Sequence, residues 1–187
     1  IPYTEEIGGA AHYGPKGDIV VESAIGKEYA IGTVQIDLYM PQRFNLAYVD
    51  KDGQEKLVVL IHRAPLGSHE RFIGFLIEHY AGAFPIWLAP VQVVVIPITD
   101  QQNQYGQKII EELQAEGIRA ELDNRNETTS AKVRDAELQK VPYMVIVGEK
   151  EVKARNISVR ARGERDLGPM MLEEFLIKIK SEIENKT

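Results

Sequence analysis

The run from His62 to Tyr80, HRAPLGSHERFIGFLIEHY, contains the residue types and spacing best suited to chemistry. Gly67 permits a sharp turn and a close approach of the backbone to a ligand. Arg71 presents a planar, permanently charged guanidinium that can stack on an aromatic base or bind a phosphate. Glu70 can hold that arginine, or a nearby group, in position. The same Gly-X-X-Glu-Arg string is also typical of a helix N-terminus that carries a surface ion pair.

The elements that must position this run begin with strands on its N-terminal side. β-Branched and aromatic residues alternate in part over residues 18–22 and 28–38, which predicts two strands. The turn sequence at 50–53 separates residues 44–49 from residues 56–61 and predicts a hairpin.

A helix and a joint follow these strands. Apolar residues recur at helical spacing from Glu70 to Tyr80, and Gly82 provides a stop signal. Strands followed by one apolar helix indicate an α+β arrangement. The segment 85–90, PIWLAP, is typical of a joint between domains. We therefore expect one domain over residues 1–88 and a second over residues 89–187.

Beyond the joint, strand and helix patterns alternate, which predicts an α/β domain with a parallel or mixed sheet. The predicted strands are residues 93–98, 119–122, 141–147 and 157–162. The predicted helices are residues 105–115, 129–139 and 171–183. The fold class expected for the whole chain is α+β followed by α/β.

Composition excludes several classes of protein. The chain has 187 residues, no cysteine, 44% hydrophobic residues and a formal net charge of −6. This apolar content supports a packed core and excludes wholesale disorder and a disulfide framework. No apolar run reaches the roughly 20 residues that cross a bilayer, so we expect a cytoplasmic protein with no membrane partner. The first residue, Ile1, is not Met, which indicates a piece excised from a longer protein.

The run from His62 to Tyr80 resembles motif 3 of class II aminoacyl-tRNA synthetases, in which strand, glycine, Glu-Arg and helix form part of the ATP site. More closely, the whole chain resembles the C-terminal part of the threonyl-tRNA synthetase family. The matching strings are HYGPK (12–16), GTVQID (32–37), PQRFNLAYVD (41–50), IHRAPLGSHERFIGFLIEHYAGAFPIWLAPVQV (61–93) and LQKVPYMVIVGEKEV (138–152). The resemblance implies the end of an antiparallel-sheet catalytic domain followed by a mixed-sheet α/β anticodon-binding domain.

The resemblance also implies a zinc ion, which selects threonine by binding its amino group and side-chain hydroxyl. His62, in the IHRA string, matches one of the three protein ligands, and a neutral imidazole is a good zinc ligand. The other family ligands, a Cys and a His, would lie upstream of Ile1. Without the resemblance, His62 is interpreted as a hydrogen-bonded histidine at a strand end.

The expected catalytic residues are Lys16 and Arg71. Tyr13 and Lys16 match family residues near the threonine and the adenylate, and Lys16 would neutralise phosphate charge during adenylate formation. Thr33 and Gln35 match positions that line the ATP and aminoacyl-adenylate pocket, and Arg71 matches the arginine that stacks on adenine. On sequence alone Lys16 is equally a solvated turn lysine, and Thr33 and Gln35 are equally ordinary sheet residues.

The second half resembles a domain that reads the anticodon. The matched residues are Asn126, Arg134, Glu151 and Arg160. Asn and Glu can hydrogen-bond splayed base edges, and Arg can pair with a guanine edge, stack, or neutralise phosphate. Lys140 stands where the family often has Arg and would serve the RNA backbone. Each residue alone is explained by a solvated charge, but residues 119–165 carry 11 Lys and Arg against 8 Asp and Glu, which favours RNA.

These matches imply the family's activity, the ATP-dependent attachment of threonine to its tRNA through threonyl-adenylate. The expected partners are threonine, ATP with Mg²⁺ and the threonine tRNA, with a homodimer in the longer protein. Motifs 1 and 2 would precede Ile1, so we expect the isolated fragment to be inactive. The alternative is a stand-alone tRNA-binding or regulatory paralogue without ligase activity. Ala30 and Ile31, which replace a common Gln-Cys pair, favour this alternative.

A third hypothesis concerns the stability of the first half. Its strands would lack neighbours from an upstream sheet and would leave exposed edges that associate with other chains. This predicts that residues 1–88 are sensitive to proteases whereas the second half is resistant.

Overall fold

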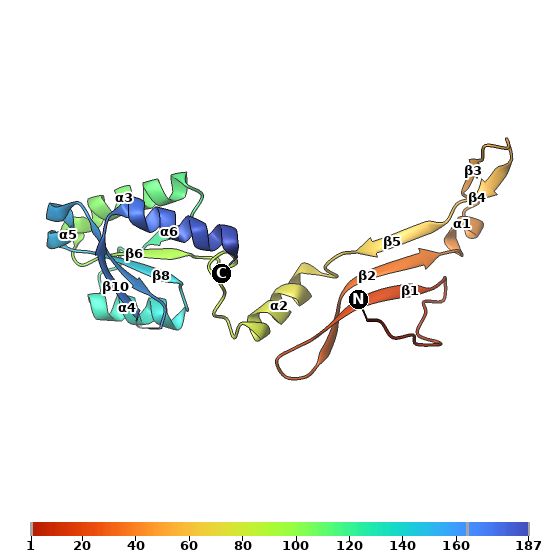
Figure 1. Cartoon of the computed structure of the whole chain (residues 1–187), viewed down its shortest axis with the longest axis horizontal. Coiled ribbons are helices and arrows are strands. Elements are labelled where there is room, and N and C mark those ends of the chain that lie inside the picture. Colours follow the sequence, from red (N-terminus) through yellow and green to blue (C-terminus); the bar gives the residue numbers. More distant parts are fainter. Residues whose placement is uncertain (1, 164, 187) are drawn as a thin grey trace. The chain divides into compact units, whose positions relative to one another are not determined.

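The computed structural model describes residues 2–163 and 165–186, and the chain divides into two compact units between His79 and Tyr80 (Figure 1). The first unit contains antiparallel sheets and the second a mixed sheet with helices, so the predicted fold class is confirmed. In the part of the chain that the structure describes, no helix has both the length and the apolar character of a membrane span.

The first unit is built on a three-stranded antiparallel sheet in the order β1-β2-β5. Its strands are β1 (Lys16–Glu22), β2 (Glu28–Asp37) and β5 (Leu60–Ala64), and β3 (Ala47–Val49) and β4 (Glu55–Leu57) form a separate hairpin. The helices are α1 (Met40–Arg43) and α2 (His69–His79). The predicted turn at 50–53 is confirmed, since Gly53 N donates to Asp50 O at 2.9 Å with a left-handed φ of 75°.

One predicted strand of this unit is wrong. Residues 56–61 were expected to form a single strand of the hairpin, but β4 ends at Leu57 and Leu60 already belongs to β5. The reason is that β2 offers a second edge, and Leu60 and Ile61 pair with it opposite Asp37 and Ile36. The chain therefore leaves a short hairpin in order to complete the central sheet.

The second unit is a five-stranded sheet in the order β10-β9-β8-β6-β7. The strands β6 (Val93–Pro97), β7 (Ala120–Leu122) and β8 (Tyr143–Val147) are parallel, and β9 (Ile157–Ala161) and β10 (Arg165–Met170) are antiparallel to their neighbours. The helices are the 3₁₀ turn η1 (Asp100–Gln102), α3 (Asn103–Ala115), α4 (Thr129–Leu138), α5 (Glu149–Ala154) and α6 (Leu172–Asn185). Figure 1 shows α3 and α6 on one face of the sheet and α4 on the other.

Two apolar layers hold this sheet between its helices. Alternate residues of β6 point to opposite faces, so Val93 and Val95 pack with the α3 and α6 side chains Leu113 and Phe175. Val94 and Ile96 pack with Met144, Ala136 and Val133 on the α4 side. A strand that is buried on both faces requires the continuous apolar run that the sequence shows. In contrast, apart from Pro41, every buried aliphatic or aromatic side chain in the described residues lies at or beyond Ile86.

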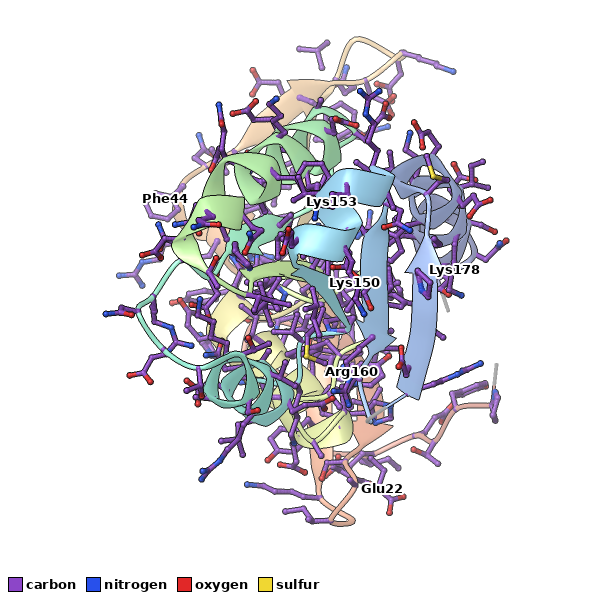
Figure 2. The ribbon with its side chains drawn as sticks, turned by 90° about the vertical axis from the view of Figure 1, so that its left-hand side faces the viewer. Glu22, Phe44, Lys150, Lys153, Arg160 and Lys178 are labelled. Atoms are coloured by element: carbon purple, nitrogen blue, oxygen red, sulfur yellow. The ribbon has the colours of Figure 1, made fainter. Side chains whose placement is uncertain are left out.

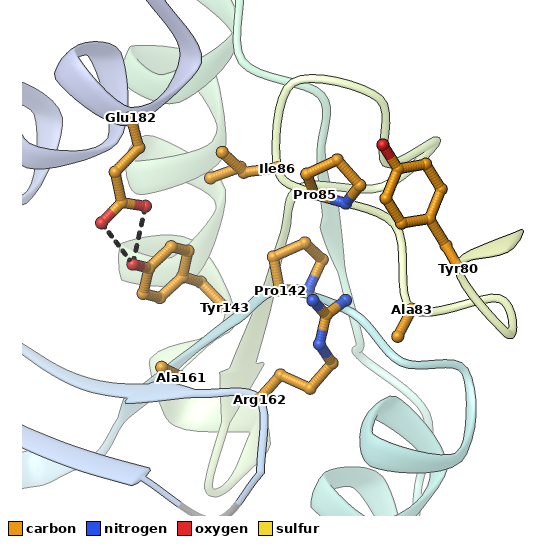
Figure 3. Close-up of a pocket in the computed structure, with 9 residues that line it drawn as sticks. All are labelled: Tyr80, Ala83, Pro85, Ile86, Pro142, Tyr143, Ala161, Arg162 and Glu182. Atoms are coloured by element: carbon orange, nitrogen blue, oxygen red, sulfur yellow. Dashed lines mark hydrogen bonds between the residues drawn. The ribbon is translucent and has the colours of Figure 1, made fainter. Parts of the chain in front are cut away.

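The segment after α2 is fastened to the second unit by polar side chains. Arg119 donates from Nε to Ala89 O and from Nη2 to Trp87 O, both at 2.9 Å, and Arg162 Nη1 donates to Phe84 O at 2.9 Å. Figure 3 shows a cavity of about 360 Å³ beside this segment, in which Tyr143 hydrogen-bonds to Glu182. Burial and Glu182 raise the pKa of the Tyr143 phenol, so it donates this hydrogen bond at neutral pH.

Four elements of the described residues were not predicted, and each lacks a periodic signal. The helices η1, α1 and α5 have three, four and six residues, too few to show a 3.6-residue period. The strand β10 contains Gly168 and Pro169, which normally argue against a strand. These two residues are tolerated because β10 is at the sheet edge and its register shifts between Asp166 and Gly168.

We predict that Phe175→Ala destabilises the second unit by about 3–5 kcal/mol, because Phe175 is fully buried and its loss leaves a cavity. Ile177→Ala on the same helix removes a side chain that is 72% exposed and is the matched control. Urea unfolding followed by circular dichroism measures both. Equal losses for the two variants would contradict the assignment of the core.

We also predict that limited proteolysis cuts the first unit well before the second. Its described residues bury almost no aliphatic or aromatic side chain, and Ile61 is 67% exposed, so local opening costs little there. Mass spectrometry of the fragments identifies the sites. Equal resistance of both units would contradict this prediction.

Candidate functional site

One face of the β1-β2-β5 sheet collects polar side chains from three strands. Lys16 on β1 lies opposite Gln35 on β2, and Gln35 lies opposite His62 on β5. Asp18 and Thr33 form the next pair on the same face of these strands. Directly opposite residues share a face, and so do residues two apart along a strand. The register therefore brings the four predicted residues Lys16, Thr33, Gln35 and His62 to one surface.

Asp18 ties two of these side chains together. Lys16 Nζ donates to Asp18 Oδ2 at 2.8 Å, and Thr33 Oγ1 donates to Asp18 Oδ1. The hydrogen bond to Asp18 and its charge raise the pKa of Lys16. The ammonium is thus paired with Asp18 on the polar face, and the lysine itself is exposed.

Tyr13 reaches the same surface from the loop before β1. Its hydroxyl donates to Gln35 Oε1, and its ring meets the His62 ring edge-on with centroids 5.7 Å apart. His62 Nε2 lies 2.9 Å from Asp37 Oδ2. The sequence analysis missed Asp37, because a lone aspartate at the end of a strand carries no signal of its own.

Arg71 is placed differently from the residues on the strands. It lies in the first turn of α2, its side chain is exposed, and its backbone N–H donates to Ser68 Oγ at 3.2 Å. Within residues 2–163 and 165–186, Glu70 and Arg71 form no ion pair with one another. Among the described residues, no side-chain hydrogen bond or ion pair joins Arg71 to the polar sheet face, and its exposed guanidinium is open to a ligand.

His62 is the residue that the resemblance assigns to a metal site. Across the described ranges, no group of three or more His, Cys, Asp or Glu residues has the arrangement of a metal site. His62 is nevertheless suited to supply one ligand, since its Nε2 is engaged by a carboxylate and Nδ1 has no hydrogen-bond partner in the described structure. A ligating histidine usually has its other ring nitrogen held in this way.

In the second unit, Arg134 and Arg160 line one cavity of about 410 Å³. Arg134 comes from α4 and Arg160 from β9, opposite Met144 on the sheet face that α4 covers. The remaining lining residues are Thr129, Ser130, Val133, Glu137 and Ile146. Arg160 Nε is buried and has no hydrogen-bond partner in the described structure. A buried guanidinium nitrogen without an acceptor is costly and favours a ligand that supplies one.

The other predicted RNA contacts lie outside this cavity. Asn126 is exposed in the loop between β7 and α4, and Glu151 is in the first turn of α5, where Oε2 accepts a hydrogen bond from Gly148 N at 2.9 Å. Both follow carboxyl ends of parallel strands and therefore lie toward the same edge of the sheet. Figure 2 shows Lys150 and Lys153 of α5 above Arg160 of β9. Lys140 donates from Nζ to Ala81 O, so it contacts the turn that follows α2.

A charged cluster that the sequence analysis missed holds the loop that carries Asn126. Arg125 binds both carboxylate oxygens of Asp123, at 2.9 and 2.7 Å, and Asp135 Oδ2 at 2.9 Å. Lys132 is buried and donates to Asp123 O at 3.0 Å. The part of the loop just before Asn126 is thus bound to α4. Acidic and basic residues alternate from 123 to 135, and this pattern could have predicted the cluster.

Comparisons with known proteins bear on both units. The family model "tRNA synthetase class II core domain (G, H, P, S and T)" matches residues 3–80, and the model "Anticodon binding domain" matches residues 92–182. Threonine–tRNA ligase of Clostridium tetani is 50% identical over 186 residues, which is 100% of this chain and 29% of the relative. That of Thermus thermophilus is 53% identical over 174 residues, or 93% of this chain and 26% of the relative.

Over its whole length the chain is therefore similar to threonine–tRNA ligases, with a class II synthetase core segment followed by an anticodon-binding segment. It spans less than a third of the length of these curated relatives. Among solved structures, the "RNA binding domain of Threonyl-tRNA synthetase" of Cryptosporidium parvum is 33% identical with a TM-score of 0.76, and the match covers 93% of this chain and 44% of that chain. Prolyl-tRNA synthetase of the same organism, 22% identical over 97% of this chain and 41% of its own, has a TM-score of 0.76 and shows the fold alone.

The two matched segments coincide with the two units. The synthetase core match ends at residue 80, next to the boundary of the first unit, and the anticodon-binding match lies wholly inside the second. The polar sheet face therefore belongs to the core segment, and the cavity of Arg134 and Arg160 belongs to the anticodon-binding segment.

We predict that Asp123→Asn weakens the second unit and alters its acid sensitivity. Hydrogen bonds from Arg125 lower the pKa of Asp123. The ionised carboxylate therefore stabilises the fold above its unfolded pKa of about 3.9, and this stability is lost as the pH falls through the folded pKa. We expect a loss of about 1 kcal/mol at pH 7 and a flatter acid limb in urea unfolding.

The control for this experiment is Glu149→Gln, which removes a carboxylate from a pair in which both side chains are 75% exposed. It is expected to leave the stability and the acid limb almost unchanged. An acid limb for Asp123→Asn that matches the parent chain would contradict the role of Asp123.

Proposed function

We propose that this chain is the C-terminal portion of a threonine–tRNA ligase. Residues 1–88 complete the catalytic domain, and residues 89–187 read the anticodon. The longer protein is a cytoplasmic homodimer that forms threonyl-adenylate from threonine and ATP with Mg²⁺, and then transfers the threonyl group to its tRNA. The observation that carries this proposal is about 50% identity to threonine–tRNA ligases over the whole chain.

The polar sheet face binds the adenylate. Lys16 places a fixed ammonium where phosphate charge develops, and preorganised charge of this kind stabilises a transition state without reorganisation. Thr33 and Gln35 line the same surface and position the substrate by hydrogen bonding. Tyr13 orients Gln35 through its hydroxyl. Two observations support these roles. The strand register brings Lys16, Thr33 and Gln35 to one face, and Tyr13 hydrogen-bonds to Gln35.

Arg71 binds the adenine of ATP. A guanidinium stacks well on an aromatic base because it is planar and weakly hydrated. Its place in the first turn of α2, with an exposed side chain, supports this role. The helix N-terminus adds a favourable field for the neighbouring phosphates.

His62 contributes one ligand to a zinc site, and the remaining ligands come from outside this chain. When bound, zinc coordinates the amino group and hydroxyl of threonine, which lets the site reject an isosteric amino acid without the hydroxyl. The support in this chain is the orientation of His62, whose Nε2 is held by Asp37. Because this chain supplies no complete ligand set, we expect it to be inactive in aminoacylation by itself.

The cavity of Arg134 and Arg160 receives an unstacked anticodon base. Arg160 is half-buried and lines this cavity, so its guanidinium reads a base edge. Arg134 is exposed and neutralises the adjacent phosphate. Asn126, from the loop before α4, and Glu151, from the first turn of α5, contact bases at the carboxyl edge of the sheet.

We predict that this chain prefers the anticodon stem-loop of threonine tRNA over the same loop with a changed anticodon, measured at one fixed salt concentration. Arg160→Ala is expected to cost about 1–3 kcal/mol with the matched loop and to relax the preference. Arg134→Ala is expected to weaken binding of both loops equally and to reduce the salt slope by about 1.

The charge-matched control is Lys108→Ala on α3, which lies on the opposite face of the sheet from α4. It removes one positive charge and is expected to leave the anticodon preference unchanged. Equal binding of both loops by the parent chain would contradict anticodon reading by this segment. An Arg160→Ala variant with undiminished preference would contradict the assigned cavity.

A further inference from the structure

Asp37 is the most enclosed carboxylate of the first unit and has an unusual set of partners. Its residue is 1% exposed, at the carboxyl end of β2. Oδ1 accepts hydrogen bonds from the backbone N–H groups of Tyr39 and Met40, each at 2.9 Å. Oδ2 lies 2.9 Å from His62 Nε2. The two oxygens therefore have separate tasks, since one caps the turn into α1 and the other faces the imidazole.

The hydrogen bonds around Asp37 decide which His62 nitrogen carries the proton. Two backbone N–H groups donate to Oδ1, an arrangement that favours the ionised carboxylate. An ionised carboxylate can only accept hydrogen bonds. Oδ2 therefore accepts from the imidazole, so Nε2 of a neutral His62 carries the hydrogen and Nδ1 keeps a free lone pair.

We propose that Asp37 is a positioning residue that holds His62 in the Nε2–H tautomer and so keeps Nδ1 as the ligating nitrogen. The ring is restrained further by the Tyr13 ring, 5.7 Å away between centroids. Nδ1 has no hydrogen-bond partner in the described part of the chain. The tautomer follows from this chain alone, and only its use in binding zinc rests on the proposed function.

The substitution Asp37→Asn separates the two tasks of this side chain. The amide oxygen replaces Oδ1 and still accepts from Tyr39 and Met40, whereas the NH₂ group replaces Oδ2 and becomes a donor toward His62. The reverse orientation is disfavoured because the NH₂ group would then face two backbone N–H donors. His62 Nε2 must accept from the amide, and the ring proton moves to Nδ1.

The experiment is nitrogen NMR of the imidazole rings of this chain, at about two pH units above the ordinary histidine pKa of about 6.5. The parent chain is expected to show His62 mainly as Nε2–H, and Asp37→Asn mainly as Nδ1–H. The matched control is Asp52→Asn in the β3–β4 turn. That carboxylate accepts from Gln54 N and pairs with Lys56, and the substitution leaves His62 as Nε2–H.

A His62 that is mainly Nδ1–H in the parent chain would overturn the proposal, and so would an Asp37→Asn variant that keeps Nε2–H. The measurement on the parent chain stands even if the variant does not fold. In the full-length ligase, Asp37→Asn is expected to reduce zinc affinity about 10- to 100-fold in competition with a chelator. An unchanged affinity would overturn the positioning role. A parent ligase that binds no zinc would overturn only the zinc site of the proposed function.

Discussion

The functional face of the first unit depends on the register between β1, β2 and β5. Side chains alternate along a strand, so a slip of one residue would move Lys16, Gln35 and His62 to the opposite face. Gly14 pins this register: its φ is +156°, and a Cβ there would lie 2.1 Å from Ile36 O. The flanking bonds Ile36 N to Pro15 O and Leu38 N to Tyr13 O fix the loop against β2. This close backbone approach thus fixes the start of β1 against β2, and the pairing of β2 with β5 places His62 on the same face.

The second unit obtains the same precision from burial. Its central strands are enclosed on both faces, so register and side-chain direction are fixed by packing. The loop between β7 and α4, at the carboxyl edge, is held in place by hydrogen bonds between charged side chains. Asp123, Arg125 and Lys132 bind the loop that carries Asn126 to α4. The rigid sheet and this cluster together explain how an exposed loop can present a side chain in a defined place.

Much of this arrangement could be predicted from the sequence. The strands β6 and β8 were predicted where apolar runs lie between turn residues, and the helices α2, α3 and α6 were predicted from their 3.6-residue period. β10 was missed because Gly168 and Pro169 break the pattern, and its edge position is a tertiary property. The cavity of Arg134 and Arg160 depends on β9 pairing with β8, which no local pattern specifies. Asp37 was missed for the same reason, since its partner His62 is 25 residues away.

Glu151 and Arg160, two of the residues predicted to contact RNA, differ in how many of their polar atoms are already hydrogen-bonded within the fold. Glu151 Oε2 already accepts a hydrogen bond from the backbone N–H of Gly148 and so caps α5. A substitution there removes a cap as well as any base contact, and the two effects combine in one measured affinity. Arg160 has a buried Nε without an acceptor in the described structure, so its loss removes a donor that the fold does not use. A change in anticodon preference on substituting Arg160 therefore reports recognition more directly than the same change at Glu151.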